Sequence, residues 1–119
     1  LQENAKMISF CNNFPEINHN EIESWNSSDN NFFIIWLKDE SSSRKINKSM
    51  NSAFKLLNDL KIRQEIITLD NNYASKNNKL AKLYKLIYFL DWVSYYSALL
   101  NNADPILIDN IKFVKKSIN

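Results

Sequence analysis

The chain has 119 residues, a formal net charge of +2 at pH 7 and no glycine. Phosphate-binding loops, dinucleotide fingerprints, nucleophile elbows and EF-hand loops place glycine where the backbone needs a positive φ or a close approach to a ligand, so the composition excludes them. The near-neutral charge gives no general electrostatic reason to bind nucleic acid or an anionic membrane. The single cysteine, Cys11, excludes an intramolecular disulfide framework. It favours a reducing compartment, cytoplasm or nucleus, with secretion into a host as the alternative.

Apolar residues make up 45 % of the chain and aromatic residues 13 %, which is enough for one folded core. We therefore predict a single helical domain over residues 1–119. Because the chain begins with Leu1 rather than methionine, we expect it to be processed or excised from a longer chain. Its 19 Asn and 13 Lys against 2 Arg indicate an AT-rich genome.

The first third of the chain contains two helical patterns. One covers residues 2–14 and ends before Pro15, because the residue that precedes proline avoids the α region. Its apolar face consists of Met7, Ile8, Cys11 and Phe14. Farther along, Asn20 and Glu23 resemble a capping box that opens a short helix.

Residues 30–40 hold six consecutive apolar side chains at positions 32–37 and show no clear period. Their types favour a strand. No hairpin partner follows, however, and a lone strand would leave its backbone polar groups unpaired. We therefore favour a helix, capped by Ser28 or Asp29, and keep the strand as the alternative.

Three helices are expected in the rest of the chain. A loop and cap at residues 41–43 precede a helix over residues 46–60, whose pattern continues to 69, and the polar stretch 70–78 breaks it. The helix at 78–101 becomes apolar on every side after Leu86, which is typical of a buried central helix. Asp104 and Pro105 are predicted to be the N-cap and first residue of a last helix. The predicted fold class is thus all-α, a compact bundle of five or six helices around a buried helix near residues 78–101.

Few side chains suggest catalysis. His19 is the only histidine, so we expect neither a classical catalytic triad nor a multi-histidine metal site. Cys11 could use His19 as a base, but its place on an apolar helical face favours a core position. Asp91 lies inside the apolar helix and could serve a small enzyme or ligand carrier, although a buried hydrogen bond is the simpler interpretation. We predict no catalytic residues, no cofactor and no metal.

Two lysine groups could contact phosphate: Lys79, Lys82 and Lys85 in one helix, and Lys112, Lys115 and Lys116 in the last. A nucleic-acid-binding helical domain that uses these lysine-rich faces is the alternative function. Only two arginines accompany them, and arginine provides most bidentate base contacts, so nucleic acid is an unlikely partner and these faces are expected to be solvated.

The aromatic side chains support the leading hypothesis, because Trp and Tyr dominate binding hot spots. We predict a non-enzymatic protein–protein interaction module, such as a pathogen or viral effector or an assembly domain. Its partner would be another protein, with a homodimer as one form, and no segment is expected to span a membrane. The predicted partner-binding residues are Tyr84, Tyr88, Tyr95, Trp36 and Phe33, whereas Trp92 is expected to be buried.

Overall fold

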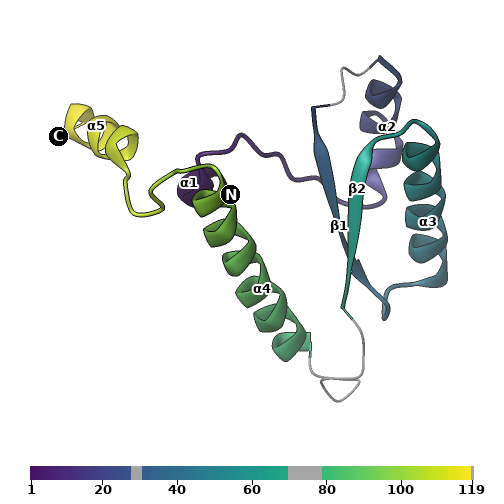
Figure 1. The fold of residues 1–119 in the computed structure, drawn as a ribbon. Helices are drawn as coiled ribbons and strands as arrows, with labels where there is room; N and C mark the ends of the chain where they lie inside the picture. The colour runs from purple at the N-terminus through teal and green to yellow at the C-terminus, as the bar shows by residue number, and fades with distance from the viewer. Residues whose placement is uncertain (28–30, 70–78, 119) are drawn as a thin grey trace. The chain divides into compact units, whose positions relative to one another are not determined.

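The structure is a computed structural model that describes residues 1–27, 31–69 and 79–118. The chain divides into two compact units, each of which is described by itself. Unit 2, Cys11–Lys79, contains an α/β arrangement, and unit 1, Leu1–Phe10 with Leu80–Asn119, is built from helices (Figure 1). The elements of unit 2 are η1 (Glu16–Asn18), α2 (Glu21–Ser24), η2 (Trp25–Ser27), β1 (Phe33–Asp39), α3 (Arg44–Asp59) and β2 (Arg63–Leu69). Those of unit 1 are α1 (Gln2–Ala5), α4 (Lys79–Leu100) and α5 (Asp109–Ile118).

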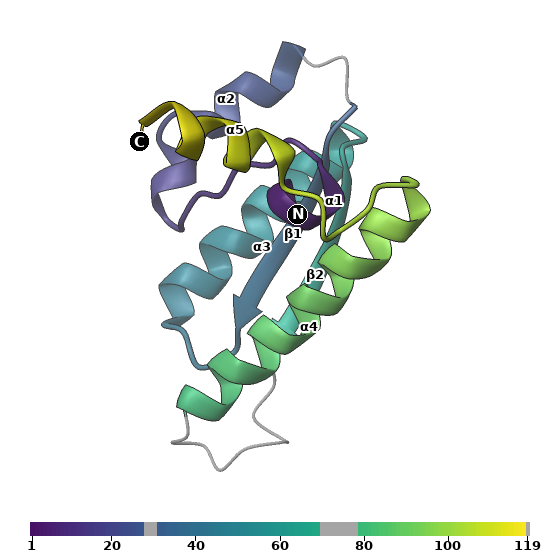
Figure 2. The same cartoon turned by 90° about the vertical axis from the view of Figure 1, so that its left-hand side faces the viewer.

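Two parallel strands show that the all-α prediction is wrong. β1 pairs with β2 from Phe33↔Arg63 to Asp39↔Leu69, and α3 connects them (Figures 1 and 2). The argument against a strand at residues 32–37 assumed a hairpin partner, but a parallel partner needs a crossover connection instead. The parallel partner is β2, which the sequence pattern had assigned to the continuation of the helix over residues 46–60.

The core of unit 2 lies between α3 and one face of this sheet. Leu57 of α3 has no exposed surface and Trp36 of β1 is only 3 % exposed. The Trp36 ring packs 5.4 Å from that of Phe14 between centroids, and its Nε1–H donates to Gln64 Oε1 at 2.9 Å. Gln64 Nε2 in turn donates to the carbonyl oxygen of Phe54 at 2.8 Å. The indole therefore joins both strands and the helix through packing and hydrogen bonds.

Helix α3 begins and ends close to the prediction. Ser43 is its N-cap, and its Oγ accepts a hydrogen bond from the backbone N–H of Ile46. At the other end Ile62 N–H donates to Leu57 O and Lys61 N–H donates to Asn58 O, both at 2.9 Å. This pair of bonds is a Schellman motif, which needs a left-handed residue at the position that Lys61 occupies.

Left-handed residues replace glycine at three places in the described part of the chain. Lys6 has φ of 55°, Lys61 has φ of 60° and Asn102 has φ of 54°. Asn102 closes the same motif after α4, where Ala103 N–H donates to Ala98 O at 2.9 Å. Because asparagine tolerates this conformation better than lysine, the two lysine positions carry the larger conformational cost.

Unit 1 differs from its predicted helices in length and burial. The left-handed Lys6 ends α1 after Ala5, so the expected helix over residues 2–14 stops early and Cys11 is exposed instead of lying in the core. Helix α4 is present, but it is not a buried central helix, because its large side chains are mostly exposed. Helix α5 starts at Asp109, four residues after Pro105. The expected caps at positions 28 and 29 and the break at 70–78 lie outside the described residues.

Candidate functional site

His19, the only histidine, follows η1 in a turn that is anchored on both sides. Ile17 belongs to the buried core of unit 2, and Ile22 packs against that core. Asn18 Nδ2 donates a hydrogen bond of 2.5 Å to Ser49 Oγ in α3. The imidazole itself is exposed. The anchored backbone therefore presents His19 to solvent from a fixed position, and residues 17–22 are called the His19 turn below.

Polar groups continue from His19 into α2. The Asn20 side chain caps α2 by accepting a hydrogen bond of 2.6 Å from the backbone N–H of Glu21. The Glu21 carboxylate accepts a hydrogen bond from Asn12 Nδ2. An imidazole, an amide and a carboxylate thus lie on consecutive residues. Imidazole is the side chain best suited to both donate and accept a proton near neutral pH, so the His19 turn can support proton transfer.

In the sequence His19 was considered as a base for Cys11, and no function was predicted for the turn around it. The signal that could have found it is the pair of apolar residues at 17 and 22, which flank a polar segment and predict an anchored turn. Among the described residues no group of three or more His, Cys, Asp and Glu side chains could hold a metal ion. Cys11 lies in the same unit, but no contact with His19 supports a nucleophile–base pair between them.

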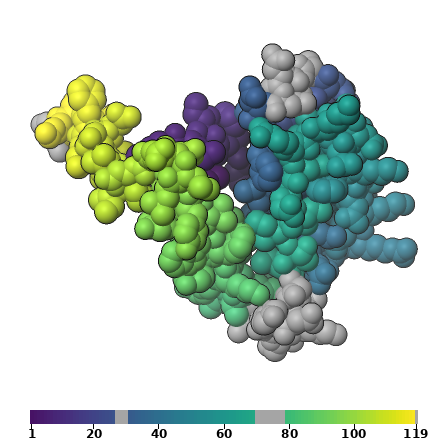
Figure 3. All heavy atoms as spheres, viewed as in Figure 1, coloured from purple at the N-terminus to yellow at the C-terminus, as the bar shows by residue number. Residues whose placement is uncertain are grey.

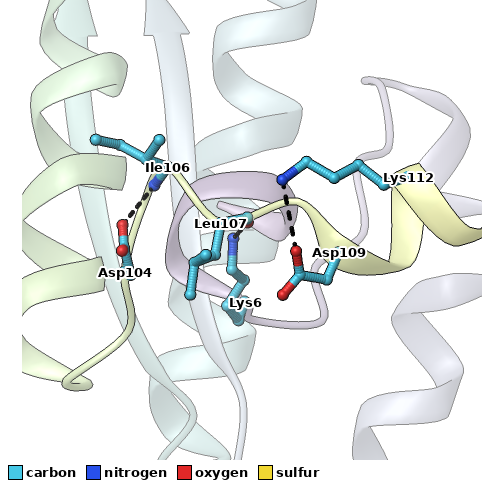
Figure 4. A network of polar contacts seen from close by, with 6 residues as sticks. All are labelled: Lys6, Asp104, Ile106, Leu107, Asp109 and Lys112. Carbon is cyan, nitrogen blue, oxygen red and sulfur yellow. Dashed lines mark hydrogen bonds and ion pairs between the residues drawn. The ribbon is translucent and has the colours of Figure 1, made fainter.

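In unit 1 a second polar network ties α1 to the segment between α4 and α5 (Figure 4). Lys6 Nζ donates to the carbonyl oxygen of Glu3 at 2.6 Å and to that of Leu107. The Leu107 contact joins positions 101 residues apart in sequence. Lys6 therefore links α1 to the segment between α4 and α5 through these two hydrogen bonds.

The segment before α5 explains why that helix starts late. Asp104 Oδ1 accepts a hydrogen bond of 2.8 Å from Ile106 N–H, so Asp104 forms a local turn rather than a helix cap. Within α5, Lys112 Nζ lies 3.6 Å from Asp109 Oδ1 (Figure 4). Lys115 and Lys116 are in the last turn, where cations interact favourably with the helix dipole. All three lysines are exposed, as predicted, whereas Lys82 of α4 is buried.

The five predicted partner-binding residues do not form one cluster. Trp36 is in the core of unit 2, and Phe33, an odd number of positions away in β1, lies on the other face of the sheet and is exposed. Tyr84, Tyr88 and Tyr95 are exposed along α4 in unit 1. Trp92, expected to be buried, is exposed as well. Partner binding by these residues stays a prediction.

In the part of the chain that the structure describes, no helix has the length and apolar character needed to cross a membrane.

Comparison with known proteins links the chain to an enzyme family. The family model for the bacterial phospho-glucose isomerase C-terminal SIS domain matches residues 1–118. A bifunctional phosphoglucose/phosphomannose isomerase of Caldicellulosiruptor bescii is 31 % identical over 98 % of this chain and 34 % of its own length. The protein of the same name from Aquifex aeolicus is 25 % identical over 99 % of this chain and 36 % of its own length. The Thermoplasma volcanium protein, also of that name, is 28 % identical over 99 % of this chain and 36 % of its own length. No solved structure matches the chain.

These similarities correct the functional predictions. The family and the relatives are isomerases, so the prediction of a non-enzymatic interaction module, effector or assembly domain is wrong, and so is the alternative of a nucleic-acid-binding helical domain. The prediction of no enzymatic function rested on the lack of a recognisable catalytic cluster or cofactor motif, and that lack does not exclude catalysis. The chain spans about one third of the length of the relatives that it matches.

Proposed function

Since the chain belongs to the bacterial phospho-glucose isomerase C-terminal SIS domain family, we propose that it forms the carboxy-terminal part of an enzyme that interconverts aldose and ketose phosphates. Phosphoglucose and phosphomannose are the substrates named for its relatives, and we propose the same pair here. The proposed activity belongs to the complete polypeptide in which residues 1–119 occur.

One observation carries the proposal. The family model matches residues 1–118, which include the α/β unit as well as the helical unit. Proteins of one name from different organisms match 98–99 % of this chain. A shared fold alone would not indicate chemistry, because one fold hosts many functions. A match over nearly the whole of this chain to several proteins of one name is a stronger argument.

The chemistry of the reaction suggests a task for the His19 turn. A hexose phosphate is cyclic in solution, so isomerisation requires the ring to open by protonation of the ring oxygen and removal of the proton from the C1 hydroxyl. Histidine suits this exchange because it can give and take a proton near neutral pH. His19 is the only such side chain in the sequence, and it is exposed on an anchored backbone. We assign ring opening to His19.

The test is conversion of glucose 6-phosphate and of mannose 6-phosphate to fructose 6-phosphate by the complete polypeptide, followed by NMR. Both conversions are expected, and an enzyme that converts neither substrate would refute the proposal. His19→Asn should lower kcat/KM by about 10²–10⁴-fold, the usual effect of losing a general acid–base group. It should also slow the exchange between the α and β anomers of glucose 6-phosphate, which reports ring opening directly.

Glu16→Gln is the matched control, because Glu16 is an exposed residue of η1 that directly precedes the His19 turn. It should leave both rates unchanged. Normal activity of His19→Asn would remove His19 from the mechanism without affecting the proposed reaction.

A further inference from the structure

Four neighbouring aromatic side chains form a cluster on α4, here called the aromatic cluster: Tyr88, Trp92, Tyr95 and Tyr96. The Trp92 ring is stacked on that of Tyr96 at 5.6 Å between centroids, and it meets the rings of Tyr88 and Tyr95 edge to face at 6.1 and 5.9 Å. Tyr95 and Tyr96 also meet at 5.7 Å. These contacts join residues of one helix, so they shape the surface but do not cover it.

The aromatic cluster is open to solvent. Tyr88 is 65 % exposed and Trp92 is 43 % exposed, and atoms of α4 (green) lie at the surface in the view of Figure 3. The side chains of α4 that are buried are instead Lys82, Ser94 and Ala98. A folded protein rarely leaves its aromatic side chains in water while it buries its small ones, so a large apolar surface of this kind marks a contact site.

We propose that the aromatic cluster is covered by the amino-terminal part of the same isomerase polypeptide. The inference deepens the proposed function and rests on it. The relatives matched over the whole of this chain are about three times its length, and the matching family is a C-terminal domain. About two thirds of such a protein therefore lies ahead of residue 1 and is available to cover α4.

The composition of the cluster fits this occupant. Three of its four members are tyrosines, whose rings lose apolar surface on burial while their hydroxyl groups still bind water or polar groups. Interfaces between domains of one chain are more polar than a domain core, and tyrosine suits such a boundary. A helix that belonged wholly to the core of unit 1 would be expected to carry Leu, Ile and Val there instead.

Photo-crosslinking in the complete polypeptide tests the inference. p-Benzoylphenylalanine is placed at position 88 in place of Tyr88, an exposed site where the change is compatible with folding. Heavy and light copies of the protein are mixed before illumination, and crosslinked peptides are identified by mass spectrometry. The expected product joins position 88 to a peptide ahead of residue 1 in the same chain. The control carries the same group at position 48 in place of Lys48, on the exposed side of α3, and should give no such product.

Three results would overturn the inference. A crosslink between heavy and light copies would mean that a second copy covers the cluster. A crosslink to residues 11–69 of the same chain would mean that unit 2 covers it. Crosslinking no stronger than at position 48 would mean that the cluster stays open. Conversion of the two hexose phosphates is measured on the unmodified protein, so a failure of the proposed function is detected separately.

Discussion

Replacement of Lys61 by glycine should make the protein more stable. Lys61 has φ of 60° at the end of α3, where its N–H and that of Ile62 close the Schellman motif. A left-handed residue other than glycine costs about 1–2 kcal/mol. Glycine avoids this cost but adds freedom to the unfolded chain, which opposes folding by about 0.5–1 kcal/mol. We expect Lys61→Gly to raise the free energy of unfolding by about 0.5–1 kcal/mol.

Urea unfolding followed by the fluorescence of Trp25 and Trp36, both in unit 2, measures this change. With an unfolding slope of about 1–3 kcal/mol/M, the midpoint should rise by a few tenths of a molar. Lys55→Gly is the matched control, because it makes the same chemical change at an exposed position inside α3. It should lower stability by about 0.5–1 kcal/mol. If Lys61→Gly lowers stability as much as Lys55→Gly does, the reasoning about this helix end is refuted.

Two pairs of substitutions, one in α3 and one at its N-cap, test the core and the cap by the same unfolding measurement. Leu57→Ala should cost about 2–5 kcal/mol, because it leaves a cavity at a site with no exposed surface. Leu56→Ala at an exposed neighbour should cost much less, and equal losses would contradict the placement of the core. Ser43→Ala should cost about 0.5–2 kcal/mol by removing the bond to Ile46 N–H, and Ser43→Asp, which keeps a capping oxygen, should retain most of that stability.

Helices α3 and α4 were predictable, because their patterns depend on residues that are close together in the sequence. In α3 the Ser43 cap and the buried stripe of Met50, Ala53 and Leu57 follow from short-range spacing, and the structure confirms this helix. The helix at α4 was also correct within one residue at each end. Helix capping and helical periodicity act over a few residues, so a single sequence contains the information for both.

The sheet was not predictable in the same way. β1 is stabilised by its pairing with β2, whose partner residues lie 30 positions away, as in Phe33↔Arg63. The short-range pattern at positions 62, 66 and 69 fitted a helix equally well, and only the long-range pairing decides between the two.

The candidate site was only partly predictable. The apolar pattern of α4 predicted a buried central helix, whereas the aromatic cluster on this helix is exposed. No enzymatic function was predicted from the sequence, because a single histidine such as His19 suggests a chemical role only when the substrate is known. The relatives, rather than the composition, provide that context.

The most direct test of the proposed function is a domain exchange. Residues 1–119 replace the matching third of the Caldicellulosiruptor bescii phosphoglucose/phosphomannose isomerase, the relative at 31 % identity. The chimera is first shown to be folded by circular dichroism and a cooperative melting transition, and its conversion of glucose 6-phosphate and mannose 6-phosphate is then measured. We expect it to convert both substrates and to lose this activity on His19→Asn. A folded chimera that converts neither substrate would contradict the assignment of this chain to the isomerase reaction.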